Sequence, residues 1–246
     1  MKKTNIIAHR GASFIAPENT MAAFEKAAEF GSDGIEFDVS LSLDQQVVVI
    51  HDDTVDRTTN GSGNVYDIPF SELVKLDAGS YFSKKFMGEP IPSLKLVLDT
   101  YRDSFKLINI ELKKDPSQKR VLSEKVVEIV KKCNCEDKIL FSSFFPGNLR
   151  RIQELLPEAN LGLLVLPGVS GVIIQGLAEM MIKKTAIHPY YEVVNQRRMK
   201  KYKKYYTSIN TWTVNTAIDI KRMIKMDVDG LITDNPVLAL GIRNEN

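Results

Sequence analysis

Three carboxylates in the sequence have the spacing of a metal site. Glu36 and Asp38 flank a single aromatic residue in an apolar run, so an extended strand places both side chains on the same face. Glu111 lies near the end of another apolar run further along the chain. Carboxylates that lie close together repel one another unless a cation holds them, and oxygen ligands alone favour a hard divalent ion over zinc. We therefore predict that Glu36, Asp38 and Glu111 bind one Mg²⁺ or Ca²⁺ ion.

Two of the three histidines stand beside the same predicted site. His9 follows the first apolar run of the chain, and His51 ends a run that returns toward Asp38. Two imidazoles beside a metal can serve as general base and general acid. Arg10 and Lys113 add positive charge that suits phosphate oxygens. Two bases, one hard metal and two cations together indicate phosphoryl chemistry.

Short apolar runs alternate with amphipathic helical patterns along most of the chain. We expect strands at residues 5–8, 34–39, 106–112, 139–144, 161–166, 186–188, 208–214 and 230–233. The clearest helices are expected at residues 19–30, 121–130 and 217–226. About eight alternating units in one domain favour an α/β protein of the TIM-type (β/α)8 barrel class. The carboxyl ends of the strands, where the candidate residues lie, meet at one rim of such a barrel.

The region after the second strand departs from this alternation. Residues 41–50 have the pattern of a hairpin whose turn is centred near Gln45, which would place His51 opposite Val39. Residues 52–92 are rich in Gly, Asp, Thr and Ser and are too long for a plain loop. We predict a single barrel domain over residues 1–246, with residues 52–92 as an insertion or lid.

The composition is that of an ordinary globular protein. A chain of 246 residues suits one such barrel, which typically needs about 250. Hydrophobic residues make up 43% and charged residues 26%, so a sizeable core can form. The formal net charge of +2, from 33 basic and 31 acidic residues, gives no support for a nucleic-acid partner.

The cysteines and the apolar runs bear on the compartment. Cys133 and Cys135 are spaced too tightly for an easy disulfide, and no second pair exists to complete a zinc site. We find no apolar region of a signal peptide and no run long enough for a bilayer. We expect a cytoplasmic protein without stable membrane insertion.

The motifs, taken in order, resemble the glycerophosphodiester phosphodiesterase family, a group of phospholipase C-like barrels. They are His9-Arg10-Gly11, Pro17-Glu18-Asn19-Thr20, Glu36-Phe37-Asp38-Val39, His51-Asp52, Asp56-Arg57-Thr58-Thr59, Ile91-Pro92-Ser93-Leu94, Asn109-Ile110-Glu111-Leu112-Lys113, Trp212-Thr213-Val214-Asn215 and Asp229-Gly230-Leu231-Ile232-Thr233-Asp234. They span nearly the whole chain. The combination is highly specific, although no single motif is.

The resemblance implies a barrel with a small insertion and hydrolysis of a glycerophosphodiester, a small-molecule substrate, to glycerol 3-phosphate and an alcohol. It assigns the acid–base pair to His9 and His51, the Ca²⁺ or Mg²⁺ ligands to Glu36, Asp38 and Glu111, phosphate binding to Arg10 and Lys113, and an aromatic wall of the glycerol pocket to Trp212. Glu18 belongs to the Glu-Asn-Thr motif of the family, where substrate binding and capping of the first helix are equal alternatives.

Three other functions make different predictions. A lysophospholipase D needs an apolar groove near the insertion, and Tyr81, Phe82, Phe86 and Met87 are the candidates for it, with core packing as the alternative. A binding protein that has lost turnover should lack a catalytic position, whereas all of them are present. A nucleic-acid binder would use the basic run at residues 197–206, which is more typical of a solvated helix face.

Several choices stay open at this point. The sequence does not decide the head group, the metal, the attacking oxygen (water or a glycerol hydroxyl), which histidine is the acid, or the oligomeric state. For His188 we favour a structural role over a catalytic one.

Overall fold

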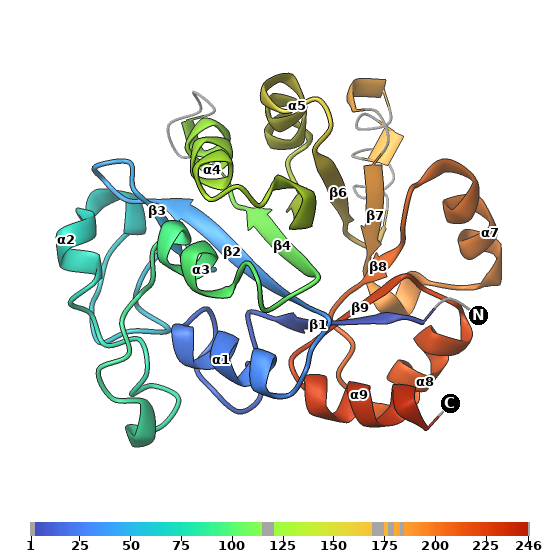
Figure 1. Ribbon diagram of the computed structural model, residues 1–246, viewed down its shortest axis with the longest axis horizontal. Coiled ribbons are helices and arrows are strands. Elements are labelled where there is room, and N and C mark those ends of the chain that lie inside the picture. The colour runs from blue at the N-terminus through green and yellow to red at the C-terminus, as the bar shows by residue number, and fades with distance from the viewer. Residues whose placement is uncertain (1–2, 115–120, 169–174, 177–179, 183–184, 246) are drawn as a thin grey trace.

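Eight parallel strands form a closed barrel in the computed structural model, which describes residues 3–114, 121–168, 175–176, 180–182 and 185–245 (Figure 1). The strands are β1 (Asn5–His9), β2 (Gly34–Leu41), β4 (Leu107–Leu112), β5 (Ile139–Ser143), β6 (Asn160–Val165), β7 (Thr185–Pro189), β8 (Asn210–Thr211) and β9 (Gly230–Thr233). They pair in the order β7-β6-β5-β4-β2-β1-β9-β8, and the parallel bridge between Ile187 and Ile209 joins β7 to β8. The predicted (β/α)8 barrel is confirmed.

Amphipathic helices surround the barrel and bury one apolar face each against it (Figure 1). They are α1 (Met21–Glu29), α3 (Leu94–Tyr101), α4 (Val121–Lys132), α5 (Pro146–Leu155), α7 (Gln196–Tyr205), α8 (Ala217–Lys225) and α9 (Pro236–Asn244). Five of them begin after a side chain that accepts a hydrogen bond from a free backbone N–H of the first turn, namely Thr20, Ser93, Asn195, Thr216 and Asn235. These caps fix where the loops that follow the carboxyl ends of the strands end.

The basic run at residues 197–206 lies almost entirely within helix α7. Met199 and Tyr202 are buried against the barrel, whereas the lysines of the helix are exposed. The cysteines are free and buried, so they form no disulfide.

Strand β3 (Val47–Val49) returns antiparallel to β2 and forms the predicted hairpin. Its turn is centred one residue earlier than predicted, because the side chain and backbone of Ser42 both bond to the backbone of Gln46. Val49, rather than His51, therefore pairs with Val39. The expected position of His51 opposite Val39 was wrong.

Residues 52–92 follow β3 and contain short helical pieces: η1 (Val65–Asp67), α2 (Phe70–Leu73) and η2 (Lys84–Phe86) (Figure 1). A small apolar cluster, separate from the main core, holds them against the hairpin and is made of Val48, Ile50, Val55, Val65, Leu73, Ala78 and Ile91. The insertion thus rests on the back of the hairpin rather than on the main core. That it acts as a lid stays a prediction.

The regular ladder of β8 is shorter than the strand predicted at residues 208–214. Pairing with β9 covers only Asn210 and Thr211. The backbone of Trp212 instead forms a parallel bridge with Tyr190, and its indole N–H donates to the carbonyl of His188 at 2.7 Å. The other strand predictions agree with the structure to within about two residues. Most of the stretch at 169–184, which the motifs match least, lies outside the described residues.

A buried ion pair joins the first and last parts of the chain at the amino end of the barrel. Arg243 of α9 bonds to the carboxylate of Asp33 and donates to the carbonyl of Thr4 at 3.1 Å. The side chains of Arg243 and Asp33 are only 8% and 10% exposed. Asp33 also accepts the backbone N–H of Ile6 at 2.9 Å, so one carboxylate ties β1 to the last helix.

Replacing Arg243 with Met should therefore destabilise the fold, because it leaves the buried Asp33 carboxylate without its main partner. We expect a loss of about 3 kcal/mol in the free energy of unfolding, measured by urea denaturation. Lys106→Met is the matched control, since that ammonium group contacts the same carboxylate at 3.4 Å but is 82% exposed. Equal effects of the two variants would contradict this account of Arg243.

Candidate active site

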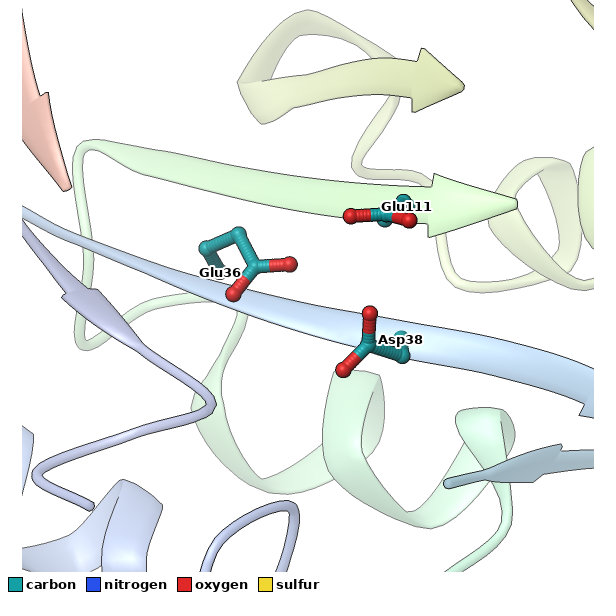
Figure 2. Close-up of side chains that lie close together, drawn as sticks. All are labelled: Glu36, Asp38 and Glu111. Atoms are coloured by element: carbon teal, nitrogen blue, oxygen red, sulfur yellow. The ribbon is translucent and has the colours of Figure 1, made fainter. Parts of the chain in front are cut away.

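The three predicted carboxylates meet at the carboxyl end of the barrel. Strand alternation points Glu36 and Asp38 to the interior, and Glu111 of β4 lies beside Asp38 in the strand register. Figure 2 shows the three side chains on neighbouring strands, turned toward one another. One oxygen of each lies within 4.8 Å of the others. All three residues are at most 9% exposed.

Two cations lie among these carboxylates. Lys113 Nζ is 2.8 Å from Asp38 Oδ1 and 2.6 Å from Glu111 Oε1. Arg10 Nε is 3.3 Å from Asp38 Oδ2, and the backbone N–H of Arg10 donates to Glu36 Oε2 at 3.0 Å. Glu36 Oε1 is buried and has no hydrogen-bond partner among the described residues. The two cations thus concentrate on Asp38 and Glu111.

The pKa values follow this uneven distribution of charge. Burial, together with the nearby Asp38 carboxylate, raises the pKa of Glu36 to about 8. Burial acts in the same direction on Asp38, but Lys113 and Arg10 outweigh it and hold the pKa of that carboxyl well below its usual range. A set of three buried carboxylates with one unpartnered oxygen suits a hard divalent cation. The residues present therefore fit the predicted metal.

Each rim histidine is hydrogen-bonded to a carboxylate. His9 Nδ1 lies 2.6 Å from Asp234 Oδ1, and His51 Nδ1 lies 2.5 Å from Asp52 Oδ1. A carboxylate at Nδ1 favours the tautomer that carries its proton there, which leaves Nε2 to exchange a proton with a substrate. His9 Nε2 is 3.9 Å from Glu36 Oε2, so this nitrogen lies on the side of the carboxylate cluster.

The environments of the two histidines shift their pKa values in opposite directions. Burial acts to lower the pKa of His9, but the hydrogen bond to Asp234 and the charge of Glu36 outweigh it and raise the pKa above its ordinary value. Burial lowers the pKa of His51, and the nearby Lys113 acts in the same direction.

One pocket joins most of the predicted residues. It is lined by His9, Arg10, Glu36, His51, Asn109, Glu111, Lys113, Phe144, Leu164, Trp212, Thr213 and Ile232. Its charged wall comes from β1, β2 and β4, and its apolar wall lies across the barrel. Phe144 and Trp212 meet edge to face in that wall, with ring centroids 5.5 Å apart.

Glu18 lies behind the pocket rather than in its wall. Its carboxylate bonds to Arg10 Nη1 at 2.7 Å and to Arg57 Nη1 at 2.8 Å. It does not cap helix α1, because Thr20 does. A direct contact of Glu18 with substrate stays a prediction, while its contact with Arg10 is the one the structure describes.

His188 lies inside the barrel and lines no part of this pocket. It is fully buried, and its ring packs on Gly162 so closely that a Cβ there would lie 2.6 Å from Nε2. Asn210 Nδ2 donates to Nε2 at 2.9 Å. Burial lowers the pKa of His188 to about 3, so the ring is neutral. These contacts agree with the structural role favoured for it.

Three polar residues of the site had been given no role from the sequence. Asp234 and Asp52 orient the two histidines, and Asn19 Nδ2 donates to Asp38 Oδ2 at 2.9 Å. Asp52 directly follows His51, and Asp234 directly follows the last strand, so both positions carried a signal that strand-end reasoning could have used. Asn19 lies in the loop before α1, and only the fold brings it to β2.

Fold and site together define a barrel enzyme equipped for phosphoryl chemistry. Residues 9–238 match the glycerophosphoryl diester phosphodiesterase family, and the chain belongs to that family. This confirms the resemblance and the enzyme class, glycerophosphodiester phosphodiesterase, that the sequence predicted.

This chain aligns with several relatives over nearly their whole length. A glycerophosphodiester phosphodiesterase of Caldanaerobacter subterraneus is 42% identical over 240 residues, which cover 98% of each chain. Another, from Bacillus altitudinis, is 38% identical over 98% of this chain and 99% of its own. A phosphodiesterase of Oleispira antarctica, solved in complex with the product sn-glycerol-3-phosphate, superposes with a TM-score of 0.90. It is 30% identical and covers 98% of this chain and 97% of its own.

Among the described residues, every helix is too short or too polar to cross a membrane.

The histidine environments predict three distinct titrations in the metal-free protein, measured by NMR of the imidazole signals. His9 should titrate above pH 6.5, His51 below it, and His188 near pH 3. Asp234→Asn removes one of the interactions that together outweigh burial at His9, so it should lower the pKa of His9 and leave that of His51 unchanged. A His51 that titrates above His9 would show that the site is arranged differently.

Proposed function

We propose that the chain hydrolyses a glycerophosphodiester to glycerol 3-phosphate and an alcohol, using a divalent metal and two histidines. The observation that carries the proposal is the single pocket in which His9, His51, Glu36, Glu111 and Lys113 meet. The product bound to the Oleispira relative supports the same substrate class.

The metal site is assigned to Glu36, Asp38 and Glu111, with Mg²⁺ or Ca²⁺ as the ion. When bound, such an ion polarises a phosphoryl oxygen and offsets the charge that develops on it. The unpartnered Glu36 Oε1 supports this assignment, since a buried carboxylate oxygen is ordinarily satisfied by a donor or a cation.

The cations and the aromatic wall bind the two ends of the substrate. Arg10 and Lys113 stabilise negative charge on the phosphoryl oxygens, because both reach the pocket from its charged side. Trp212, backed by Phe144, packs against the glycerol part. Glu18 holds the Arg10 guanidinium in place from behind.

The opposite pKa shifts favour one assignment of the acid and the base. His51, with its lowered pKa, is neutral near pH 7 and takes the proton from the attacking oxygen. This oxygen belongs to water, or to the neighbouring glycerol hydroxyl, in which case a cyclic phosphate forms and water then opens it to glycerol 3-phosphate. His9, with its raised pKa, stays protonated to higher pH than His51 and gives its proton to the departing alcohol. Asp52 and Asp234 stabilise the protonated forms of their partners.

Release of glycerol 3-phosphate from glycerophosphocholine and glycerophosphoethanolamine tests the proposal directly. We expect turnover that EDTA abolishes and that Mg²⁺ or Ca²⁺ restores. His9→Ala and His51→Ala should each lower kcat by roughly 10²- to 10⁴-fold, the usual contribution of a positioned acid or base. His188→Asn serves as a control for loss of a histidine outside the pocket, once its folding is verified. Wild-type turnover in either rim variant would defeat the acid–base assignment.

A single-chain lipid with the same head group is the second candidate substrate. Tyr81, Phe82 and Met87 of the insertion are exposed by 40%, 38% and 68%, which leaves an apolar patch on that segment. The patch lies near the pocket, since the Tyr81 hydroxyl accepts the backbone N–H of Glu18.

Rates on lysophosphatidylcholine and glycerophosphocholine separate the two candidates. We expect the higher kcat/KM on glycerophosphocholine, because the pocket itself has only a short apolar wall. The double variant Phe82→Ser and Met87→Ser should leave kcat/KM on glycerophosphocholine unchanged. A preference for the lipid that this variant removes would favour the second candidate.

A further inference from the structure

Arg57 of the insertion makes four hydrogen bonds to two carboxylates. Its Nη1 and Nη2 donate to Glu18 Oε2 and Oε1, each at 2.8 Å. Its Nε and Nη2 donate to Asp52 Oδ2 and Oδ1, at 2.6 Å and 3.2 Å. Only a planar guanidinium has the donors to bind two carboxylates in this forked way. The contact is therefore much more directional than an ordinary surface ion pair.

Each of these carboxylates also forms a hydrogen bond with a residue that lines the pocket. Glu18 Oε1 also accepts from Arg10 Nη1 at 2.7 Å, and Asp52 Oδ1 also bonds to His51 Nδ1 at 2.5 Å. The result is a chain of alternating basic and acidic side chains that runs Arg10–Glu18–Arg57–Asp52–His51. Arg57 is the central member, although the described lining of the pocket does not include it.

The three segments that this chain connects lie far apart in the sequence. Glu18 lies in the loop between β1 and α1, His51 follows β3, and Arg57 lies in the insertion. Tyr81 reaches the same loop from the insertion through its bond to the Glu18 backbone. The insertion is thus fastened to the rim at the point where the phosphate-binding and proton-transferring side chains are held.

Arg10 has a particular need for such support. Its backbone adopts a φ of 56°, in the left-handed region that a non-glycine residue rarely occupies. Its side chain must nevertheless point past Asp38 into the pocket. The guanidinium of Arg10 lies between Asp38 and the Glu18 carboxylate, and Arg57 binds that Glu18 carboxylate from the other side.

We infer that Arg57 is a positioning residue for the reaction, which orients His51 through Asp52 and Arg10 through Glu18. The inference rests on the proposed function. Residues in such supporting positions typically contribute about 10- to 100-fold to activity. A purely structural role, in which Arg57 only fastens the insertion, would lower the melting temperature and leave the turnover of the folded enzyme unchanged.

The test compares Arg57→Met in two backgrounds, with kcat and KM for glycerophosphocholine measured well below the melting temperature of every variant. In the wild-type background we expect kcat/KM to fall by about 10- to 100-fold. In an Asp52→Asn, Glu18→Gln background the same change should lower kcat/KM by less than about 3-fold, because the effects of residues that act through one another are not additive. Equal losses in both backgrounds, or no loss in either, would overturn the inference.

Two further variants sharpen the comparison. Arg57→Lys keeps the charge but cannot fork to both carboxylates, so most of the loss should remain, and full activity in this variant would contradict the positioning role. Lys75→Met is the matched control, since it removes an exposed ion pair with Glu72 from the same insertion and should leave kcat/KM unchanged.

Failure of the proposed function itself would be recognised separately. The proposed reaction would be contradicted if the wild-type enzyme released no glycerol 3-phosphate with either metal. The ring-nitrogen NMR shifts of His51 would then test the inference about Arg57. We expect a fixed Nδ1–H tautomer in the wild type and an averaged signal in Arg57→Met. Identical His51 signals in the two proteins would overturn the positioning role without any reference to turnover.

Discussion

Uncompensated negative charge in a buried place is the constraint on which this site depends. Glu36, Asp38 and Glu111 bring three carboxylates into the barrel mouth, and Arg10 and Lys113 supply two cations among them. One carboxylate is left over. Glu36 is the carboxylate that lacks a positive partner, since one of its oxygens has no hydrogen-bond partner among the described residues and its pKa is raised to about 8. Either a proton or a cation must occupy that position, and a divalent ion would serve both the fold and the reaction.

The barrel turns this local problem into a catalytic geometry. Parallel strands end at one rim, so His9 from β1, the carboxylates from β2 and β4, and Trp212 after β8 converge although these strands lie far apart in the sequence. Outside this first layer, acidic partners fix the directions of the basic groups. Asp234 and Asp52 hold the histidines, and the carboxylates that Arg57 joins connect the insertion to the same rim.

Residues on regular strands were the ones that the sequence could predict. Contacts set by loops were beyond reach. The bond between His9 and Asp234 spans 225 positions, and the register of His51 depended on how Ser42 closes a turn. The contacts of Arg57 likewise require the path of an irregular insertion, which no periodic pattern encodes.

The charge deficit at Glu36 can be measured without substrate. Isothermal titration of the metal-free protein with Mg²⁺ or Ca²⁺, in two buffers of different ionisation enthalpy, reports both the ion bound and the protons released. We predict one ion per chain, with proton release at pH 7 because the raised pKa keeps Glu36 protonated until the ion arrives. Glu36→Gln should weaken binding by about 10-fold or more and abolish the proton release. Absence of binding for both ions, or unchanged binding in Glu36→Gln, would contradict the account.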